Sequence, residues 1–323
     1  MSIFNTGKSL IKKVKVVPVF LTINDEYAPY AACAIRSLTQ HTDPNRFYRV
    51  IILYDKLAFG NRVKIRNLVT KNCEIQFRKL KNSLALRAII KHCASKTGSG
   101  DFFSSAVYFY RSFISRLFPQ YDKAIYIDSD VILLDDIGEL FDINLEDNVI
   151  GACVDPKVSA VPEFRDYVEK AVGVPAEEYI NSGVLLMDLK QLRKMHYLST
   201  MIGIIEKYNA SLVAPDQDYL NVILRGKIKH LPLAWNAAPS DNLPSDTKLV
   251  HFNLSEKPWF YHNVVGEDIF WSVAKVSGFI NELLHRRENF TVNDKRMDRA
   301  KRESLIKKAE KLAKVKEPII KSE

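Results

Sequence analysis

Residues 123–136, KAIYIDSDVILLDD, decide how the rest of the chain is interpreted. Residues 124–127 are apolar, aromatic and β-branched, which is typical of a buried strand. The strand ends at Asp128 and Asp130, two carboxylates one residue apart, and a second apolar run follows at once. Buried carboxylates need a compensating charge, and ligands of open α/β sheets bind where strands end. A divalent cation that carries phosphates would supply this charge, whereas a turn with solvated aspartates is the simpler alternative.

Strands and helices alternate on both sides of this segment. Before it, the sequence predicts strands at 14–23, 50–54 and 73–77 and helices at 29–38, 61–69 and 105–117. After it, the predicted strands are 149–154, 184–187 and 248–252, and the predicted helices are 136–141, 191–208 and 214–224. This alternation indicates an α/β fold with a mixed, mostly parallel sheet flanked by helices.

Length and composition fit a globular protein with either one large domain or one domain plus an appendage. Of the 323 residues, 47% are hydrophobic and 26% are charged, so there is ample material for a core. We expect a main domain at 14–288 and a helical tail at 289–323. Cys33, Cys73, Cys93 and Cys153 form no C-x-x-C pair, which predicts buried free thiols in a reducing compartment. No apolar run reaches the ~18 residues that a membrane-spanning helix needs, and we expect a cytoplasmic protein.

The tail is strongly basic. Residues 291–323 hold eleven Lys or Arg and six Asp or Glu, which accounts for five of the nine net positive charges. Its apolar residues share one helical face: Leu305, Ile306, Ala309, Leu312 and Ala313. A basic amphipathic helix predicts peripheral binding to an anionic membrane surface, on the inner face of the cell membrane. The alternative is a solvated helix packed on the main domain. No recognition motif accompanies the positive charge, so we expect no nucleic-acid partner.

Further motifs follow one another in a fixed order around the D-x-D pair. They are PVFLTINDEYAPY at 18–30, the Tyr108 to Arg111 segment, NSGVLLMDL from Asn181, DQDYLN at 216–221, LPLAWN ending at Asn236, and His251 followed by Lys257-Pro258-Trp259. In this order they resemble glycosyltransferase family 8, the retaining nucleotide-sugar transferases that include glycogenin and bacterial lipopolysaccharide galactosyltransferases. The resemblance covers most of the chain and implies a GT-A-type nucleotide-binding fold.

The resemblance also implies roles for individual residues. Asp128, Asp130 and His251 correspond to the ligands of Mn²⁺, for which Mg²⁺ is an alternative, and this donor set suits manganese. The positions that bind the UDP-sugar donor correspond to Asn24, Asp25, Tyr27, Arg111, Asp128, Ser129, Asp130, Asn181 and Lys257. The catalytic positions correspond to Asp216, Gln217 and Lys257. Glu26 and Asn24 depart from the residues common in the family, and Leu254 stands where close relatives have a phosphate-binding glycine.

The expected reaction is transfer of a hexose, galactose or glucose, to a glycan, glycolipid or protein acceptor, as in the synthesis of lipopolysaccharide or surface polysaccharide. Two other functions remain open. YIDSDV also fits the D-x-D-x-[TV] signature of haloacid-dehalogenase-type phosphatases, in which Asp128 would be the nucleophile. The second alternative is a non-catalytic module that binds a nucleotide sugar through the same aspartates and histidine.

Overall fold

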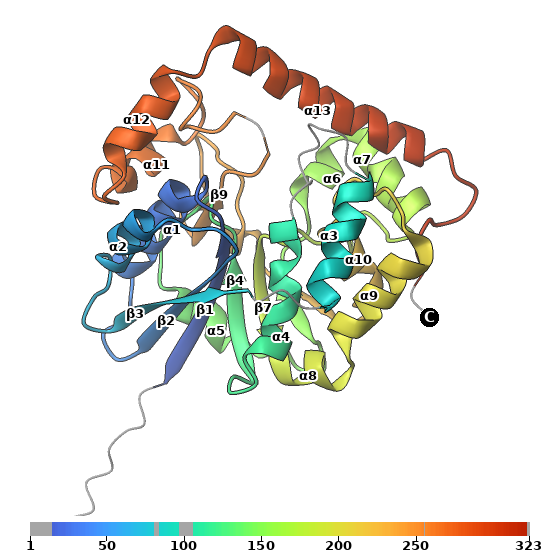
Figure 1. Ribbon diagram of the computed structural model, residues 1–323, viewed down its shortest axis with the longest axis horizontal. Helices are drawn as coiled ribbons and strands as arrows, with labels where there is room; N and C mark the ends of the chain where they lie inside the picture. Colours follow the sequence, from blue (N-terminus) through green and yellow to red (C-terminus); the bar gives the residue numbers. More distant parts are fainter. Residues whose placement is uncertain (1–14, 81–83, 97–105, 255, 322–323) are drawn as a thin grey trace, which may run out of the picture.

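The computed structural model describes residues 15–80, 84–96, 106–254 and 256–321 (Figure 1). The first residue of the predicted strand 14–23 and of the predicted helix 105–117 lie outside these ranges. Within them, every helix is too short or too polar to cross a lipid bilayer.

A seven-stranded sheet with the order β3-β2-β1-β4-β7-β6-β8 lies at the centre of the fold. Its strands are β1 (Val16–Ile23), β2 (Phe47–Tyr54), β3 (Cys73–Lys79), β4 (Lys123–Ile127), β6 (Ile150–Ala152), β7 (Val184–Asp188) and β8 (Ile228–His230). Strand β7 pairs antiparallel with both β4 and β6, and all the other pairs are parallel. The predicted mixed, mostly parallel sheet is therefore confirmed.

A separate two-stranded ribbon consists of β5 (Val131–Leu133) and β9 (Leu249–His251). The two strands are antiparallel, and Val131 lies opposite His251. Because β5 begins directly after Asp130, this pairing brings a histidine from late in the sequence next to the D-x-D pair.

Helices cover both faces of the central sheet because successive side chains of its strands point to opposite faces. In β1, Val19 and Leu21 belong to one hydrophobic core and Phe20 to the other. The first core is covered by α1 (Ala28–Gln40), α2 (Phe59–Arg66), α5 (Ile137–Asp142), η3 (Leu233–Trp235), α11 (Glu267–Ala274) and α12 (Ile280–Glu288).

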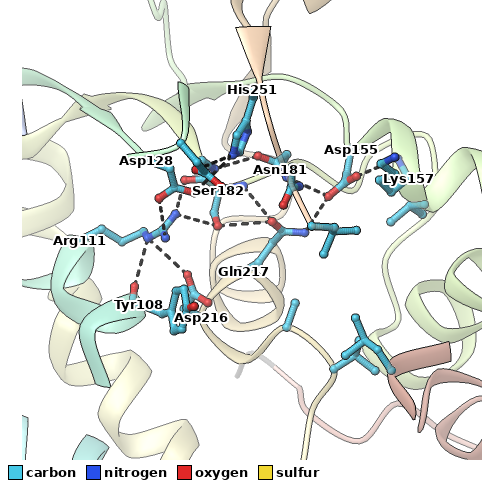
Figure 2. Close-up of a pocket in the computed structure, with 18 of the residues that line it drawn as sticks. Tyr108, Arg111, Asp128, Asp155, Lys157, Asn181, Ser182, Asp216, Gln217 and His251 are labelled. Atoms are coloured by element: carbon cyan, nitrogen blue, oxygen red, sulfur yellow. Dashed lines mark hydrogen bonds and ion pairs between the residues drawn. The ribbon is translucent and has the colours of Figure 1, made fainter. Parts of the chain in front are cut away.

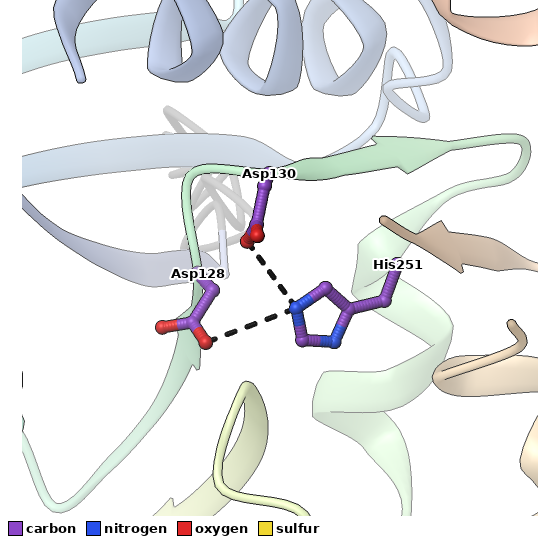
Figure 3. Close-up of side chains that lie close together, drawn as sticks. All are labelled: Asp128, Asp130 and His251. Atoms are coloured by element: carbon purple, nitrogen blue, oxygen red, sulfur yellow. Dashed lines mark ion pairs between the residues drawn. The ribbon is translucent and has the colours of Figure 1, made fainter. Parts of the chain in front are cut away.

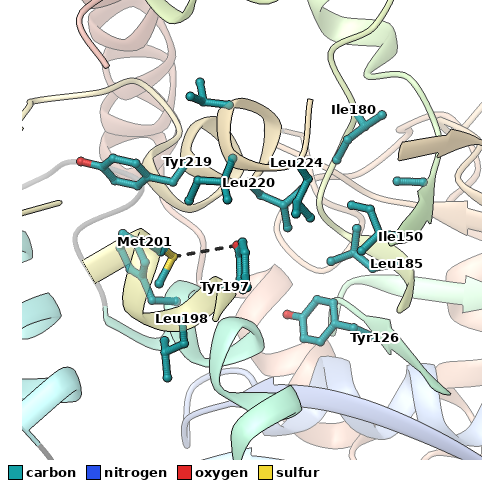
Figure 4. Close-up of a cluster of buried hydrophobic side chains, with 14 of the residues drawn as sticks. Tyr126, Ile150, Ile180, Leu185, Tyr197, Leu198, Met201, Tyr219, Leu220 and Leu224 are labelled. Atoms are coloured by element: carbon teal, nitrogen blue, oxygen red, sulfur yellow. Dashed lines mark hydrogen bonds between the residues drawn. The ribbon is translucent and has the colours of Figure 1, made fainter. Parts of the chain in front are cut away.

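The second core contains more helices than the first. Its helices are α3 (Leu84–Lys96), η1 (Ala106–Phe113), α4 (Ile114–Leu117), α6 (Pro156–Ala160), α7 (Pro162–Tyr167), η2 (Val168–Val172), α8 (Leu189–Lys194), α9 (Tyr197–Tyr208), α10 (Pro215–Ile223) and α13 (Val292–Leu312). Figure 4 shows Tyr126 and Leu185 of the sheet facing Tyr197 and Met201 of α9 across this core.

Two predicted helices are wrong in detail. The predicted helix 191–208 is two helices, α8 and α9, because His196 has a left-handed backbone with φ of 55° between them. The predicted helix 105–117 is the 3₁₀ helix η1 followed by the single turn α4. The helical periodicity continues across both breaks, so hydrophobic spacing alone could not reveal them.

The predicted tail helix is confirmed, and its apolar side packs on the domain. Helix α13 starts at a capping box in which the side chains of Thr291 and Asp294 each accept a backbone N–H of the other residue. Leu305 and Ala309 are buried in the second core, and beyond the helix Ile320 is only 1% exposed. The apolar stripe of the tail is therefore turned toward protein.

The predicted buried free thiols are confirmed for three of the four cysteines. Cys33, Cys73 and Cys153 are free and buried, and burial raises the pKa of each thiol to about 12. The side chain of Cys93 lies outside the described residues.

Candidate active site

A pocket lies at the carboxyl end of β4, beside the first turn of α10 and the segment that leads into β7 (Figure 2). Of the residues predicted to form the site, all except Asp25 line this pocket: Asn24, Tyr27, Arg111, Asp128, Ser129, Asp130, Asn181, Asp216, Gln217, His251 and Lys257. The fold thus gathers side chains that are as much as 233 positions apart in the sequence, as from Asn24 to Lys257.

Three of these side chains form a group that could hold a metal ion. One ligand atom each of Asp128, Asp130 and His251 lie within 4.8 Å of one another (Figure 3). His251 Nε2 lies 3.2 Å from Asp130 Oδ1 and 3.9 Å from Asp128 Oδ2. The two carboxylates follow β4 and the histidine ends β9, so the ribbon of β5 and β9 sets their separation.

A chain of hydrogen bonds fixes which nitrogen of His251 carries the proton. The backbone N–H of Gly183 donates to Asn181 Oδ1, which therefore is an acceptor and also receives Asn236 Nδ2 at 2.9 Å. The other atom of that amide, Asn236 Oδ1, must then accept from His251 Nδ1 at 2.8 Å. In the neutral imidazole, the lone pair of Nε2 faces the two carboxylates. Three electron-rich atoms converge there, which a cation would stabilise.

The carboxylate of Asp128 is oriented from its other side. Its Oδ1 accepts hydrogen bonds from Arg111 Nη2 at 3.0 Å and from the Tyr126 hydroxyl at 2.7 Å. The Arg111 guanidinium also lies over the Tyr126 ring, 4.4 Å from its centroid. These contacts leave Asp128 Oδ2 turned toward His251 (Figure 3).

Asp130 is held as an anion by a second cation. Lys257 Nζ donates to Asp130 Oδ2 at 2.6 Å and also to the Phe252 carbonyl. Burial opposes ionisation of Asp130, but the Lys257 ammonium, together with the His251 ring when that ring is protonated, holds the pKa of Asp130 well below its usual range. Each aspartate thus offers one oxygen to the pocket and has the other paired with a protein cation.

Arg111 is a buried cation in the wall of the pocket. It is therefore not one of the solvated charges that are common on helix surfaces. Its side chain is 4% exposed and donates to the Ser182 carbonyl and hydroxyl and to the Tyr108 carbonyl. Its Nε also lies 3.3 Å from Asp216 Oδ2. This one guanidinium therefore balances the charges of both Asp128 and Asp216.

Asp216 and Gln217 lie in the first turn of α10, and the Gln217 amide is held by hydrogen bonds through both its nitrogen and its oxygen. Gln217 donates to Asp155 Oδ2 at 3.0 Å and accepts from the backbone N–H of Ser182 at 3.0 Å. Asp216 Oδ2 has no hydrogen-bond donor among the described residues, although its ion pair with Arg111 is close. Burial raises the pKa of Asp216 to about 6, against the effect of Arg111. Asp216 can therefore accept a hydrogen bond from a ligand hydroxyl.

Comparison with known proteins assigns this arrangement to a family. Residues 18–263 match the protein family described as glycosyl transferase family 8. The chain belongs to this family. The family assignment confirms the resemblance seen in the sequence and argues against the phosphatase alternative, which does not account for the motifs after residue 181.

Several relatives of this family 8 chain carry glycosyltransferase names. A Haemophilus influenzae protein named as a glycosyltransferase is 29% identical over 67% of this chain and 61% of its own length. The lipopolysaccharide 1,2-glucosyltransferase of Escherichia coli is 26% identical over 48% of this chain and 49% of its own length. The chain thus spans less than two thirds of either relative.

Solved structures show the same GT-A-type fold. The galactosyltransferase LgtC, solved with donor and acceptor sugar analogues, has a TM-score of 0.67 and 23% identity over 80% of this chain and 96% of its own. The bifunctional glycosyltransferase WbbM has a TM-score of 0.69 and 24% identity over 85% of this chain and 52% of its own.

Asp155 is a polar residue of the pocket in this family 8 chain that sequence reasoning missed. Asp155 is buried and caps α6 by accepting the backbone N–H of Lys157 at 2.9 Å. Its second oxygen accepts from both Asn181 Nδ2 and Gln217 Nε2 at 3.0 Å. The signal was present, because an Asp-Pro pair directly follows the predicted strand 149–154.

The donor-binding positions predicted at Asn24, Asp25 and Tyr27 lie only partly in the pocket. Asn24 Oδ1 accepts the backbone N–H of Tyr27, and both residues line the pocket. Asp25 is exposed, and its Oδ1 binds the backbone N–H of Ala58 and the Asn61 amide. The structure thus places Asp25 outside the pocket lining, where it holds the loop before α2.

The structure explains why glycine is suited to two positions, 183 and 254. A Cβ atom at Gly183 would clash with His251 Cε1 and lie 2.8 Å from Asp128 Oδ2, so the glycine of NSG allows the metal-ligand group to form. Leu254 has a φ of 67°, a left-handed conformation that is strained for leucine. This conformation agrees with the glycine expected at that position in close relatives.

Proposed function

We propose that this family 8 glycosyltransferase transfers galactose or glucose from a UDP-sugar to a glycan or glycolipid acceptor, with retention of the anomeric configuration. A protein acceptor is the alternative. The observation that carries the proposal is the convergence of His251 Nε2, Asp130 Oδ1 and Asp128 Oδ2 on one point. The names of the lipopolysaccharide 1,2-glucosyltransferase and of the galactosyltransferase LgtC support the choice of hexose and acceptor.

Asp128, Asp130 and His251 would hold Mn²⁺, with Mg²⁺ as the alternative. Their two carboxylates and one imidazole suit manganese, and the hydrogen bond to Asn236 already points Nε2 at the site. The bound ion supplies a Lewis acid for the diphosphate leaving group.

The remaining charges of the pocket bind and position the donor. Lys257 Nζ, beside Asp130, adds positive potential where the departing diphosphate gains charge. Arg111 extends this potential and keeps Asp128 in place. Tyr27 and the backbone near Ser129 border the part of the pocket that we assign to the uridine.

Asp216 and Gln217 act at the transferred sugar. Asp216 Oδ2 accepts a sugar hydroxyl and stabilises positive charge at the anomeric carbon, because it lacks a donor of its own among the described residues. The Gln217 amide is held by Asp155 and Ser182 and is a weak nucleophile, which favours front-side displacement. In that step the bond from the anomeric carbon to the phosphate oxygen breaks, and the acceptor oxygen bonds on the same face. The acceptor proton passes to the departing phosphate.

We also propose that the exposed basic side of α13 binds an anionic membrane surface, where a glycolipid acceptor would be presented. The cations on that side are exposed: Arg296, Arg299, Lys301, Arg302, Lys307, Lys311 and Lys314. Since Leu305 and Ala309 are buried against the domain, attachment would be electrostatic, without insertion of the apolar stripe.

A panel of UDP-sugars with Mn²⁺, scored for released UDP, tests the reaction. We expect release from UDP-galactose or UDP-glucose, and its loss in Asp130→Asn, which removes one ligand charge and preserves side-chain size. A protein that binds UDP with Mn²⁺ and releases none from any donor would be the non-catalytic module. Release of inorganic phosphate with phosphorylated Asp128 would instead support the phosphatase.

A further inference from the structure

Helix α13 lies outside the family match, yet it borders the pocket. The match ends at residue 263, and α13 begins at Val292. Leu305 of this helix is one of the residues that line the pocket. Figure 2 shows the helix, in red-brown, at the end of the pocket away from Arg111 and Asp128. A segment outside the family match therefore forms part of the wall.

The position of α13 is fixed at both of its ends. Before the helix, the Phe290 ring stacks on Phe260 at 4.6 Å, and within its first turns Asp298 accepts the Tyr261 hydroxyl at 2.6 Å. After the helix, the backbone N–H of Ile319 donates to the Ala171 carbonyl at 2.7 Å. Leu305 is thus held against the pocket by contacts on either side of it.

The pocket near α13 is apolar, in contrast to the charged end at the aspartates. Apart from Lys157, which lines the pocket beside Val158 on α6, its lining there is aliphatic and aromatic: Val158, Phe164, Tyr167, Val168, Tyr179, Val213 and Leu305. The two tyrosines present their rings, because both hydroxyls donate to the buried carboxylate of Asp218 at 2.7 and 2.6 Å. This surface can bind C–H groups but few hydroxyls.

The donor and the acceptor should bind at different ends of the pocket, because they need different chemical groups. The diphosphate requires the charges at Asp130 and Lys257, and the transferred sugar requires the polar groups at Asp216 and Gln217. The acceptor must approach that sugar from the remaining side of the pocket, toward α7 and α13.

We propose that α13, through Leu305, forms an apolar wall of the acceptor subsite. This wall selects acceptors that carry an apolar group next to the reacting sugar. The proposal rests on the proposed function, since it assigns the donor to the charged end.

Phenyl and methyl β-glycosides of glucose and galactose are suitable probes, since they differ only in the apolar group. Their binding to the full chain saturated with UDP and Mn²⁺ can be measured by ligand-observed NMR. We expect the phenyl glycoside to bind about tenfold more tightly than the methyl glycoside. Leu305→Ala should remove most of this preference, whereas Leu305→Met should keep it. Met297→Ala, an exposed position on the same helix, is the matched control.

Each outcome decides the proposal. Equal binding of phenyl and methyl glycosides, or no binding of either, would overturn it, and so would a preference unchanged in Leu305→Ala. UDP affinity should stay within twofold in all three variants, because Leu305 is remote from the charged end. If the unsubstituted chain does not bind UDP with Mn²⁺, the proposed function itself fails. That failure is distinguishable from failure of the acceptor wall.

Discussion

Single residues set the geometry of the metal-ligand group before any ion is bound. A backbone N–H at Gly183 orients Asn181, Asn181 orients Asn236, and Asn236 sets the proton on His251. Asp128 and Asp130 are oriented from outside by Arg111 and Lys257. A side chain at position 183 would meet His251, Asp128 and Asn181, three members of this arrangement.

Gly183→Ala should abolish Mn²⁺ binding and reduce metal-dependent UDP release at least about 100-fold. The added Cβ would clash with His251 Cε1 and approach Asn181 Oδ1 to 2.9 Å, which would displace two members of the network. Titration of Mn²⁺ in the presence of UDP, followed by calorimetry, measures the effect. Gly203→Ala is the control, since a Cβ there meets nothing within 4 Å. Equal Mn²⁺ affinity in both variants would contradict the network.

The raised pKa of the buried Asp218 carboxyl should make the free energy of unfolding depend on pH. Burial raises its pKa to about 6, although the hydroxyls of Tyr167 and Tyr179 lower it. The folded state thus holds this proton more tightly than the unfolded chain, so this carboxyl makes folding less favourable as pH rises from about 4 to about 6. The shift corresponds to about 3 kcal/mol.

The Asp218→Asn variant isolates this pH dependence. The free energy of unfolding, measured with urea, should fall in the unsubstituted chain as pH rises through this window. The Asn variant should not show this fall, because Asn cannot ionise. Parallel curves for the two proteins would show that Asp218 ionises in the folded state as it does in water.

At the scale of elements, strands were predicted better than the helices that pack in the second core with α13. Strand β4 and the turn after it follow from an apolar run that ends in carboxylates, and β1, β2 and β7 follow from similar runs. The strand predicted at 248–252 corresponds to β9, but its pairing with β5 could not be derived, because strands of three residues show no pattern that identifies a partner. Only the family resemblance identified His251 as a candidate metal ligand. Helices α6 and α7 were missed because they are short and their apolar spacing is irregular.

The tail helix was predicted, but not which surface its apolar stripe covers. Amphipathic spacing is the same for a helix that faces lipid and one that faces protein. Burial of Ala309 and Ile320 resolves this, and we propose that residues 289–323 are an appendage that completes the domain at 14–288.

Ala309→Asp should lower the free energy of unfolding by about 3 kcal/mol, since Ala309 is fully buried and its surroundings are apolar. Ala300→Asp introduces the same charge at an exposed position of α13 and should change it by less than about 0.5 kcal/mol. Urea unfolding of both variants gives the difference. Similar values for the two would mean that α13 does not pack on the domain in solution.

At the scale of the whole molecule, α13 separates two environments. Its buried side closes one end of the pocket, and its exposed side carries most of the positive charge of the tail. A membrane that binds the exposed side would lie next to the acceptor end of the pocket. The two proposals for this helix are independent, because they use opposite faces.

Charge reversal at Arg296, Arg299 and Arg302 tests membrane binding. Each Lys or Arg near an anionic surface contributes about 1 kcal/mol, so reversing three should weaken sedimentation with anionic liposomes more than a hundredfold. Reversal of Lys71, Lys190 and Lys194, which are exposed elsewhere, changes net charge equally and should have a smaller effect. Equal losses would show that net charge alone, and not α13, controls binding.

The most direct test of the central claim is a proton NMR time course of the purified chain with Mn²⁺ and UDP-glucose or UDP-galactose, without acceptor. Water then takes the place of the acceptor hydroxyl, and the anomeric signals report which face it attacks. The proposed mechanism predicts that UDP forms and the α-anomer of the hexose appears first, with both signals absent in Asp130→Asn. First appearance of the β-anomer would contradict retention, and an unchanged rate in Asp130→Asn would contradict the metal-dependent site.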